Sequence, residues 1–178
     1  MTELIALLRG VNVGRANRIS MAQLRELITD LGYQNPRTLL QSGNAVFEAT
    51  AGQAKGCAGK LEKALKEQAG VSSTVVIRTA AELRQAIAAD PLTDIAVDGS
   101  RHLIGFLQDA PTAAAVKQLN ALDLPPDRIA VRGKHVYLWM TDGVLKSRLS
   151  KSGWEKIVGT PVTARNANTV RKLEAMLG

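Results

Sequence analysis

The chain has 178 residues, of which 46% are hydrophobic, 22% charged and 3% aromatic, and its formal net charge is +7. This composition is that of a globular protein with an aliphatic core, and the length fits one domain or two small ones. The positive charge makes polyanions the partners to consider, although it is spread evenly along the chain.

Cys57 is the only cysteine, which excludes an intrachain disulfide and a cysteine zinc cluster. Glu3 and Arg9 interrupt the apolar start that a signal peptide requires, and no apolar run approaches the roughly 20 residues needed to cross a bilayer. With His102 and His135 as the only histidines, no metal set is apparent. We therefore expect a cytoplasmic protein with no membrane partner, no metal and no cofactor.

The first half of the chain reads as strand, helix, strand, strand, helix, strand and helix. Strands are expected at 4–8, 37–41, 44–49 and 74–78. Helices are expected to start at Ser20, at about residue 53 and after Thr79. Ser20 with Gln23, and Thr79 with Glu82, have the spacing of capping boxes, which mark helix N-termini.

The second half repeats this order. Strands are expected at 103–107, 127–131, 135–140 and 160–164, and helices from Pro111, over roughly 144–158 and from Asn166. The repeated order predicts an α+β protein that is a tandem duplication of two ferredoxin-like (βαββαβ) units with antiparallel sheets, over residues 1–90 and 91–178. Leu4–Leu8 and Leu103–Leu107 should then be equivalent central strands. Because both are apolar throughout, both faces of each sheet should be covered.

One connection differs between the halves. The first strands are 99 residues apart but the hairpin glycines Gly43 and Gly133 only 90, so nine residues (99 − 90) are extra in the first half. Most of them fall between the first strand and first helix, which residues 9–19 join in half one and Gln108–Ala110 join in half two. A loop longer than chain closure requires is a place where function usually sits.

That loop has the chemistry of an anion site. Glycine amides, a helix N-terminus and arginine guanidinium groups all suit a phosphate. In a ferredoxin-like unit the exit of the first strand and the hairpin turn share a sheet edge, so loop 9–18 and turn 41–44 should form one concave, positively charged site. The candidate ligand-binding residues are Arg9, Gly10, Asn12, Gly14, Asn17, Arg18, Gln41, Ser42, Gly43 and Asn44. The alternatives are a solvated loop and an ordinary hairpin turn.

A second candidate lies near the end of the chain. Residues 143–172 carry seven basic side chains and one acidic one, and they contain a strand-to-helix junction with Arg165, Asn166 and Thr169 as candidate anion ligands. The same run could be the solvated face of two helices. Whether this junction joins the site at residues 9–18 is left open.

His135, Tyr137 and Trp139 alternate on one face of a predicted strand, a pattern that could stack RNA bases on an open sheet. The alternative, which we favour, is a core, and it predicts that Tyr137 and Trp139 are covered. Cys57 shares a helical apolar stripe and is expected in the core as well.

Three blocks of sequence resemble one bacterial family, domain of unknown function 1697. They are Ala6–Gly14 with Asn17, Gln41–Phe47, and Thr163–Asn166 followed by Thr169 and Lys172-Leu173. The resemblance implies two ferredoxin-like units in tandem. It implies no activity, because the family has no established one.

The function expected from these residues is binding of a phosphate-bearing ligand, a nucleotide or nucleic acid, at the Arg9–Arg18 loop. One alternative is an enzyme acting on a small anionic substrate, with Arg9, Asn12, Ser42 and Asn44 supplying electrostatic stabilisation. The other is an interaction domain without ligand. No catalytic residue and no oligomeric state can be assigned. Because neither Arg9 nor Asn44 lies on an apolar stripe, replacing both should leave stability nearly unchanged.

Overall fold

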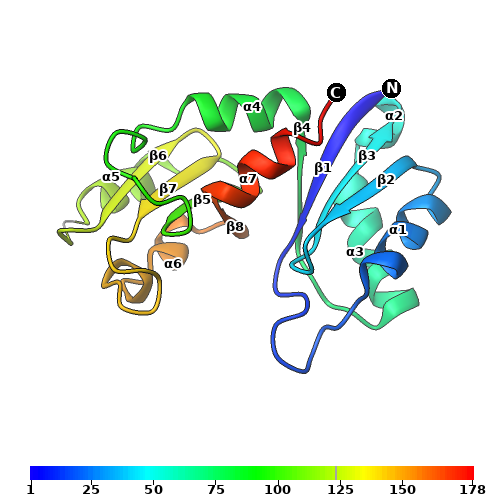
Figure 1. The fold of residues 1–178 in the computed structure, drawn as a ribbon, viewed down its shortest axis with the longest axis horizontal. Coiled ribbons are helices and arrows are strands. Elements are labelled where there is room, and N and C mark those ends of the chain that lie inside the picture. Colours follow the sequence, from blue (N-terminus) through cyan, green and yellow to red (C-terminus); the bar gives the residue numbers. More distant parts are fainter. Residues whose placement is uncertain (123) are drawn as a thin grey trace. The chain divides into compact units, whose positions relative to one another are not determined.

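The computed structural model describes residues 1–122 and 124–178. The chain divides into two compact units (Figure 1), with unit 1 made of Met1–Arg84 and Lys172–Gly178 and unit 2 of Gln85–Arg171. The boundaries fall inside two helices, α4 (Ala80–Ala88) and α7 (Ala167–Glu174). The repeat boundaries predicted above, 1–90 and 91–178, describe sequence order and remain a prediction.

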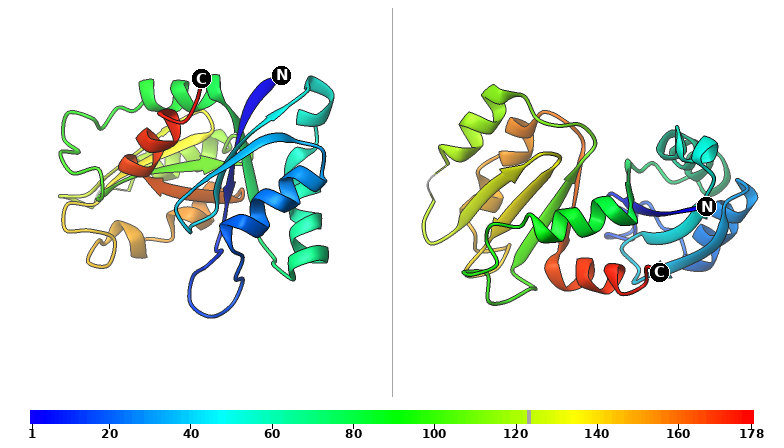
Figure 2. Two further views of the ribbon diagram at one scale, coloured as in Figure 1. Left: turned by 45° about the vertical axis from the view of Figure 1, so that its right-hand side comes forward. Right: turned by 90° about the horizontal axis from the view of Figure 1, so that it is seen from above.

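Unit 1 is a four-stranded antiparallel sheet with helices packed on one face (Figure 2). Its elements are β1 (Thr2–Leu8), α1 (Met21–Asp30), β2 (Gln34–Leu39), β3 (Asn44–Ala49), α2 (Ala51–Ala54), α3 (Cys57–Ala69) and β4 (Val75–Thr79). The strand order is β2-β3-β1-β4, with antiparallel pairing throughout. Strand β1 is therefore central, as predicted.

Unit 2 repeats this topology. Its elements are β5 (His102–Leu107), α5 (Ala113–Asn120), β6 (Arg128–Arg132), β7 (His135–Trp139), a 3-10 turn η1 (Leu149–Lys151), α6 (Trp154–Val158) and β8 (Val162–Asn166). The order is β6-β7-β5-β8, again antiparallel, so β5 occupies the position that β1 has in unit 1. The prediction of an α+β protein with two antiparallel sheets is confirmed.

Three predicted helices differ from the observed ones, two of them because a glycine interrupts the helix. The helix expected from residue 53 is two helices, because Gly56 has a φ of +72° and interrupts it. The long helix expected over 144–158 was wrong. Only η1 and α6 form there, and Gly153, with a φ of +76°, separates them. The helix expected from Pro111 begins at Ala113, because the Thr112 hydroxyl caps it by accepting from Ala115 N.

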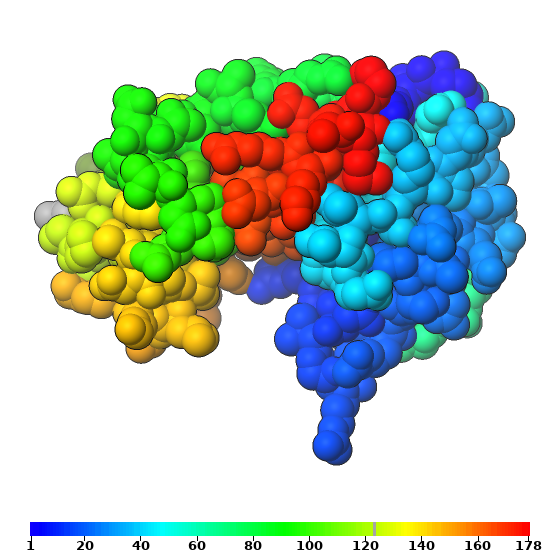
Figure 3. All heavy atoms as spheres, in the orientation of Figure 1, coloured from blue at the N-terminus to red at the C-terminus, as the bar shows by residue number. Residues whose placement is uncertain are grey.

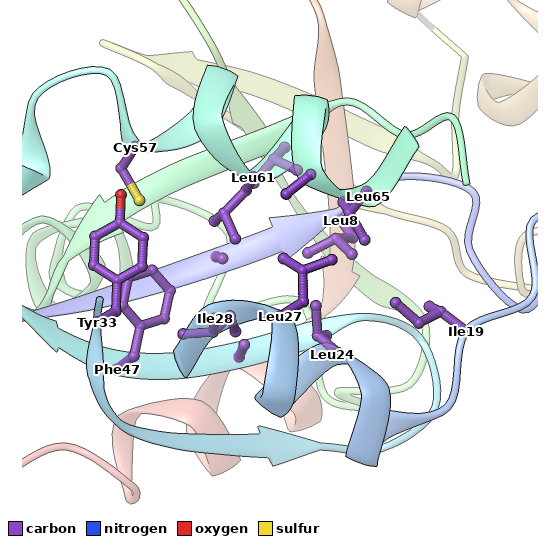
Figure 4. Packing of buried hydrophobic residues seen from close by; sticks show 14 of the residues in the cluster. Leu8, Ile19, Leu24, Leu27, Ile28, Tyr33, Phe47, Cys57, Leu61 and Leu65 are labelled. Atoms are coloured by element: carbon purple, nitrogen blue, oxygen red, sulfur yellow. The ribbon is translucent and has the colours of Figure 1, made fainter. Parts of the chain in front are cut away.

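The core of unit 1 lies between its sheet and helices α1 and α3 (Figure 4). Leu24, Leu27 and Ile28 of α1 meet Leu61 and Leu65 of α3 above the sheet, and all five are at most 4% exposed. Leu4–Leu8 are at most 1% exposed, so both faces of β1 are covered, as its uniformly apolar sequence predicted.

At one end of this core Tyr33 packs on Phe47, with ring centroids 4.9 Å apart. Its hydroxyl points toward the thiol of Cys57 (Figure 4), which is 1% exposed. The prediction that Cys57 is a core residue is confirmed.

The aromatic strand of unit 2 is also a core strand. Tyr137 is fully buried and Trp139 is 7% exposed, so the face that bears them is covered as we favoured. The Tyr137 hydroxyl donates to the Ala86 carbonyl, 2.6 Å away in α4. Burial raises the pKa of Tyr137 to about 12. Among the residues that the structure describes, no helix combines the length and apolarity needed to span a membrane.

Candidate functional site

Loop 9–18 leaves the end of β1 and is closed at its neck by Asn12. The Asn12 side-chain amide donates to the carbonyls of Ile19 (2.8 Å) and Gln41 (2.6 Å), and its oxygen accepts from Ile19 N (2.9 Å). Asn12 N donates to Asn17 O at 2.9 Å. Asn12 therefore ties the two ends of the loop together and ties both to the β2–β3 turn.

The loop is braced on its other side by the segment that precedes β4. Arg9 N donates to Thr74 O (2.9 Å), and the Ser73 hydroxyl donates to Arg9 O (2.8 Å). The Asn17 side-chain oxygen accepts from Ser72 N at 3.2 Å. The loop backbone is thus anchored to two separate parts of unit 1.

The glycines and asparagines of the loop are explained by its backbone. Gly10, Asn12, Gly14 and Asn17 have φ values of +67°, +56°, +66° and +51°. Glycine enters this left-handed region without a Cβ clash, and asparagine enters it more readily than other side chains. The backbone conformation of the loop therefore accounts for these glycines and asparagines, whether or not they also contact a ligand.

The structure brings the β2–β3 turn against this loop. Leu8 N donates to Gly43 O at 2.9 Å. A Cβ on Gly43 would lie 2.6 Å from Val11 Cγ2 and 2.7 Å from Leu8 Cβ, and the φ of Gly43 is +81°. Only glycine permits this contact. Residues 9–18 and 41–44 therefore meet at one edge of the unit 1 sheet.

Asn44 holds the turn from inside. Its side chain is fully buried, and its amide donates to Leu39 O and to the Ser42 hydroxyl, each at 2.9 Å. The sequence led us to expect that Asn44 can be replaced without loss of stability, whereas these contacts of a buried side chain predict that its replacement lowers stability. Leu40, beside it, has a φ of +58° and is 50% exposed, a strained position that sequence patterns did not indicate.

A pocket of about 320 Å³ lies at the base of the loop. Its lining consists of Asn12, Arg18, Ile19, Ser20, Gln23 and Gln41. Ser20 caps α1, because its hydroxyl accepts from Gln23 N while its own N–H donates to the Gln23 side chain, both at 3.1 Å. The predicted capping box is confirmed.

The outer surface of the loop is basic. Arg9, Arg15 and Arg18 are exposed, and no acidic residue occurs between Arg9 and Ser20. Val13, near the tip, is 73% exposed. Figure 3 shows the loop, in blue, standing out from the surface of unit 1. Arg15 and Val13 are features of this surface that the candidate residues named from the sequence did not include.

The Arg165–Thr169 junction belongs to unit 2 and is built differently. Asn166 caps α7 by accepting from Thr169 N at 2.9 Å, and Thr169 is 8% exposed. Arg165 donates to the Thr163 hydroxyl and the Ala164 carbonyl, each at 2.9 Å, and burial lowers the pKa of Arg165 to about 10. These contacts are made within the junction itself.

Two buried polar pairs in unit 2 were not apparent from the sequence, because each joins residues distant along the chain. His102 Nε2 lies 3.1 Å from Asp90 Oδ2, and Asp127 accepts from the Ser147 hydroxyl (2.6 Å) and Thr141 N (3.0 Å). Within residues 1–122 and 124–178, no three or more His, Cys, Asp or Glu side chains gather as a possible metal site.

Comparison with known proteins identifies the family. The family described as "Protein of unknown function (DUF1697)" matches residues 1–137. The chain belongs to the DUF1697 family. It is also similar in fold to a structure described as that of the conserved bacterial protein SP0830 from Streptococcus pneumoniae, with a TM-score of 0.77 and 22% identity over 99% of each chain. No curated protein matches this DUF1697 chain.

Proposed function

We propose that this DUF1697 protein binds a phosphate-bearing ligand, a nucleotide or nucleic acid, through loop 9–18. The observation that carries the proposal is that one loop bears three exposed arginines, Arg9, Arg15 and Arg18, and that its sequence contains no acidic residue. Guanidinium groups donate two parallel hydrogen bonds to a phosphate and keep their charge at all physiological pH values.

The bracing of the loop supports binding. Asn12 closes the neck and Asn17 anchors the loop to Ser72, so the backbone that bears the arginines is held before a ligand arrives. A preorganised loop loses less conformational entropy on binding than a flexible one. In this proposal Asn12, Asn17, Gly43 and Asn44 act as the frame, while the arginines with Gln41 and Ser42 face the ligand.

Binding is favoured over catalysis by the same contacts. The enzyme hypothesis needs the Asn12 and Asn44 amides to stabilise developing charge, but both amides donate to backbone carbonyls.

The Arg165–Thr169 junction stays a second proposed anion site.

The shared strand order of the two units supports the further proposal that residues 1–90 and 91–178 are ferredoxin-like copies.

A single, buried cysteine fits the proposed cytoplasmic location.

The test compares two variants with the same net charge. One replaces Arg9, Arg15 and Arg18 with alanine, and the control replaces three exposed lysines of α3, Lys60, Lys63 and Lys66, with alanine. Calorimetry measures binding of ATP, and fluorescence anisotropy measures binding of labelled 20-nucleotide single-stranded and 20-bp double-stranded DNA.

At least one of these probes should bind the wild type, and each lost arginine contact should cost about 1.5–3 kcal/mol of its affinity. The α3 control should stay within about twofold. Equal weakening in both variants would show that net charge, and not the loop, is responsible.

A further inference from the structure

We infer that the ligand of loop 9–18 is a nucleic-acid duplex, held by its backbone with the loop tip in a groove, and not a single strand or a free nucleotide. This inference rests on the proposed function and narrows it to one class of ligand. It follows from the burial of the aromatic side chains, the lining of the pocket and the shape of the loop.

The chain offers single strands no aromatic platform. Proteins that bind single-stranded nucleic acid stack its bases on exposed aromatic side chains. This chain has two tryptophans, two tyrosines and two phenylalanines, all in the part that the structure describes. All six are buried, with exposures of 3% for Tyr33, 0% for Phe47, Phe106 and Tyr137, 7% for Trp139 and 5% for Trp154.

The pocket beside the loop is unsuited to a free nucleotide. Small-ligand sites cover most of the ligand with apolar and aromatic walls. Of the six residues that line this pocket Ile19 alone is apolar, and at 3% exposed it has almost no surface left to cover a base. The pocket can accept a phosphate, but it has no wall for the base.

The loop has a narrow, projecting tip of a shape that can enter a groove. The hydrogen bond from Asn12 N to Asn17 O closes the neck, so Val13, Gly14, Arg15 and Ala16 form a tip that stands out from unit 1 (Figure 3). The tip presents one arginine and one exposed valine, while Arg9 and Arg18 lie at the two ends of the loop.

In a duplex, a phosphate backbone runs along each side of a groove. The loop matches this arrangement, because its tip lies between two arginines. Proteins that enter the minor groove insert arginine into its negative potential and often add an apolar side chain. Arg15 and Val13 are placed for these two roles, and Arg9 and Arg18 for contacts to phosphates beside the groove. Backbone recognition needs no stacking, which agrees with the buried aromatics.

The experiment measures anisotropy of labelled 20-bp DNA, 20-bp RNA and their single strands, with ATP as competitor, and cosedimentation with phosphatidylglycerol–phosphatidylcholine vesicles. We expect at least one duplex to bind about tenfold more tightly than either of its strands at equal salt. Because each neutralised phosphate contributes about 0.9 to the slope of log Kd against log salt, loss of the two phosphate contacts of Arg9 and Arg18 should lower that slope by about 1.8 in the triple-arginine variant. The control variant, which lacks Lys60, Lys63 and Lys66, should keep the wild-type slope.

The remaining outcomes separate the two proposals. Preference for single strands or ATP that still depends on the loop arginines would overturn the duplex assignment and leave the proposed function standing. Binding to vesicles that Val13→Asp abolishes, without binding to either duplex, would also overturn it. Failure of every probe to bind the wild type would contradict both proposals. The DNA and RNA arms identify which duplex geometry is preferred.

Discussion

The two strand-to-helix connections at the sheet edge are the most informative comparison in this molecule. In unit 1 Leu8 N donates to Gly43 O and Arg9 N to Thr74 O, and in unit 2 Leu107 N donates to Lys134 O and Gln108 N to Pro161 O, all at 2.9 Å. Both units therefore close this edge with equivalent bonds, and unit 2 reaches α5 within a few residues. Loop 9–18 is additional to a junction that is already complete.

The difference extends to charge. The unit 2 connection contains Asp109, whose N–H donates to the Thr160 hydroxyl at 3.2 Å, and no basic residue. The unit 1 loop contains three arginines and no acid. Since the shared backbone bonds close the edge in both units, we expect replacement of the loop arginines to leave the fold of unit 1 intact.

The largest expected effect is on the reaction rate of the Cys57 thiol, which lies in unit 1 and reports on that unit alone. It is 1% exposed, and burial raises the pKa of its thiol, although the Tyr33 hydroxyl acts in the opposite direction. Native protein at pH 8 should react with Ellman's reagent about a thousandfold more slowly than protein in urea, because the thiol reacts only when unit 1 opens. Rapid reaction without denaturant would contradict the described core.

The same thiol gives unit 1 a defined pH dependence. A thiol whose folded pKa is raised contributes stability that is fully present below its unfolded pKa of about 8.5 and is lost as the pH rises towards the folded value. Urea unfolding between pH 7 and 10 should show this loss in the wild type and not in Cys57→Ala.

The hairpin glycines give the next largest effect. Gly43→Ala should destabilise the protein by about 2–5 kcal/mol, combining left-handed backbone strain with overpacking against Leu8 and Val11. Gly133, with a φ of +54° and nothing within 4 Å of its added Cβ, should cost only about 1–2 kcal/mol. Urea unfolding measures both. Equal losses would mean that the loop does not pack on the turn as described.

Asn44 and Lys134, each the residue that follows a hairpin glycine, test the turn itself. Asn44→Ala should cost about 1–3 kcal/mol, because Leu39 O and the Ser42 hydroxyl lose a buried donor. Lys134→Ala, at an exposed turn position, should stay within about 0.5 kcal/mol of wild type. If thermal unfolding gave a neutral Asn44→Ala, that residue would again be a candidate ligand contact.

Much of the fold could be predicted from the sequence because its signals are local. Ser20 with Gln23 and Thr79 with Glu82 each form the capping box that their spacing predicted. The apolar run Leu4–Leu8 indicated a strand covered on both faces. Such patterns depend on a few neighbouring residues, so tertiary structure rarely changes their meaning.

The candidate site could be predicted only in part, because its frame depends on distant contacts. The sequence indicated that loop 9–18 and turn 41–44 meet, but Asn12 and Asn44 were interpreted as ligand groups. The Asn12 amide also donates to the carbonyl of Gln41, 29 residues away, a contact that the sequence did not indicate. A side chain's hydrogen-bond partner outside its own turn is set by packing, which periodicity does not record.

The measurement that tests the central claim most directly combines affinity and stability in one variant. Replacing Arg9, Arg15 and Arg18 with alanine should change stability by under about 0.5 kcal/mol, roughly 1–2 °C in Tm for a chain of this size. The same protein should lose at least about tenfold in affinity for the phosphate probe that the wild type binds. If the variant instead unfolds while the wild type binds no phosphate probe, the loop is structural and the account is contradicted.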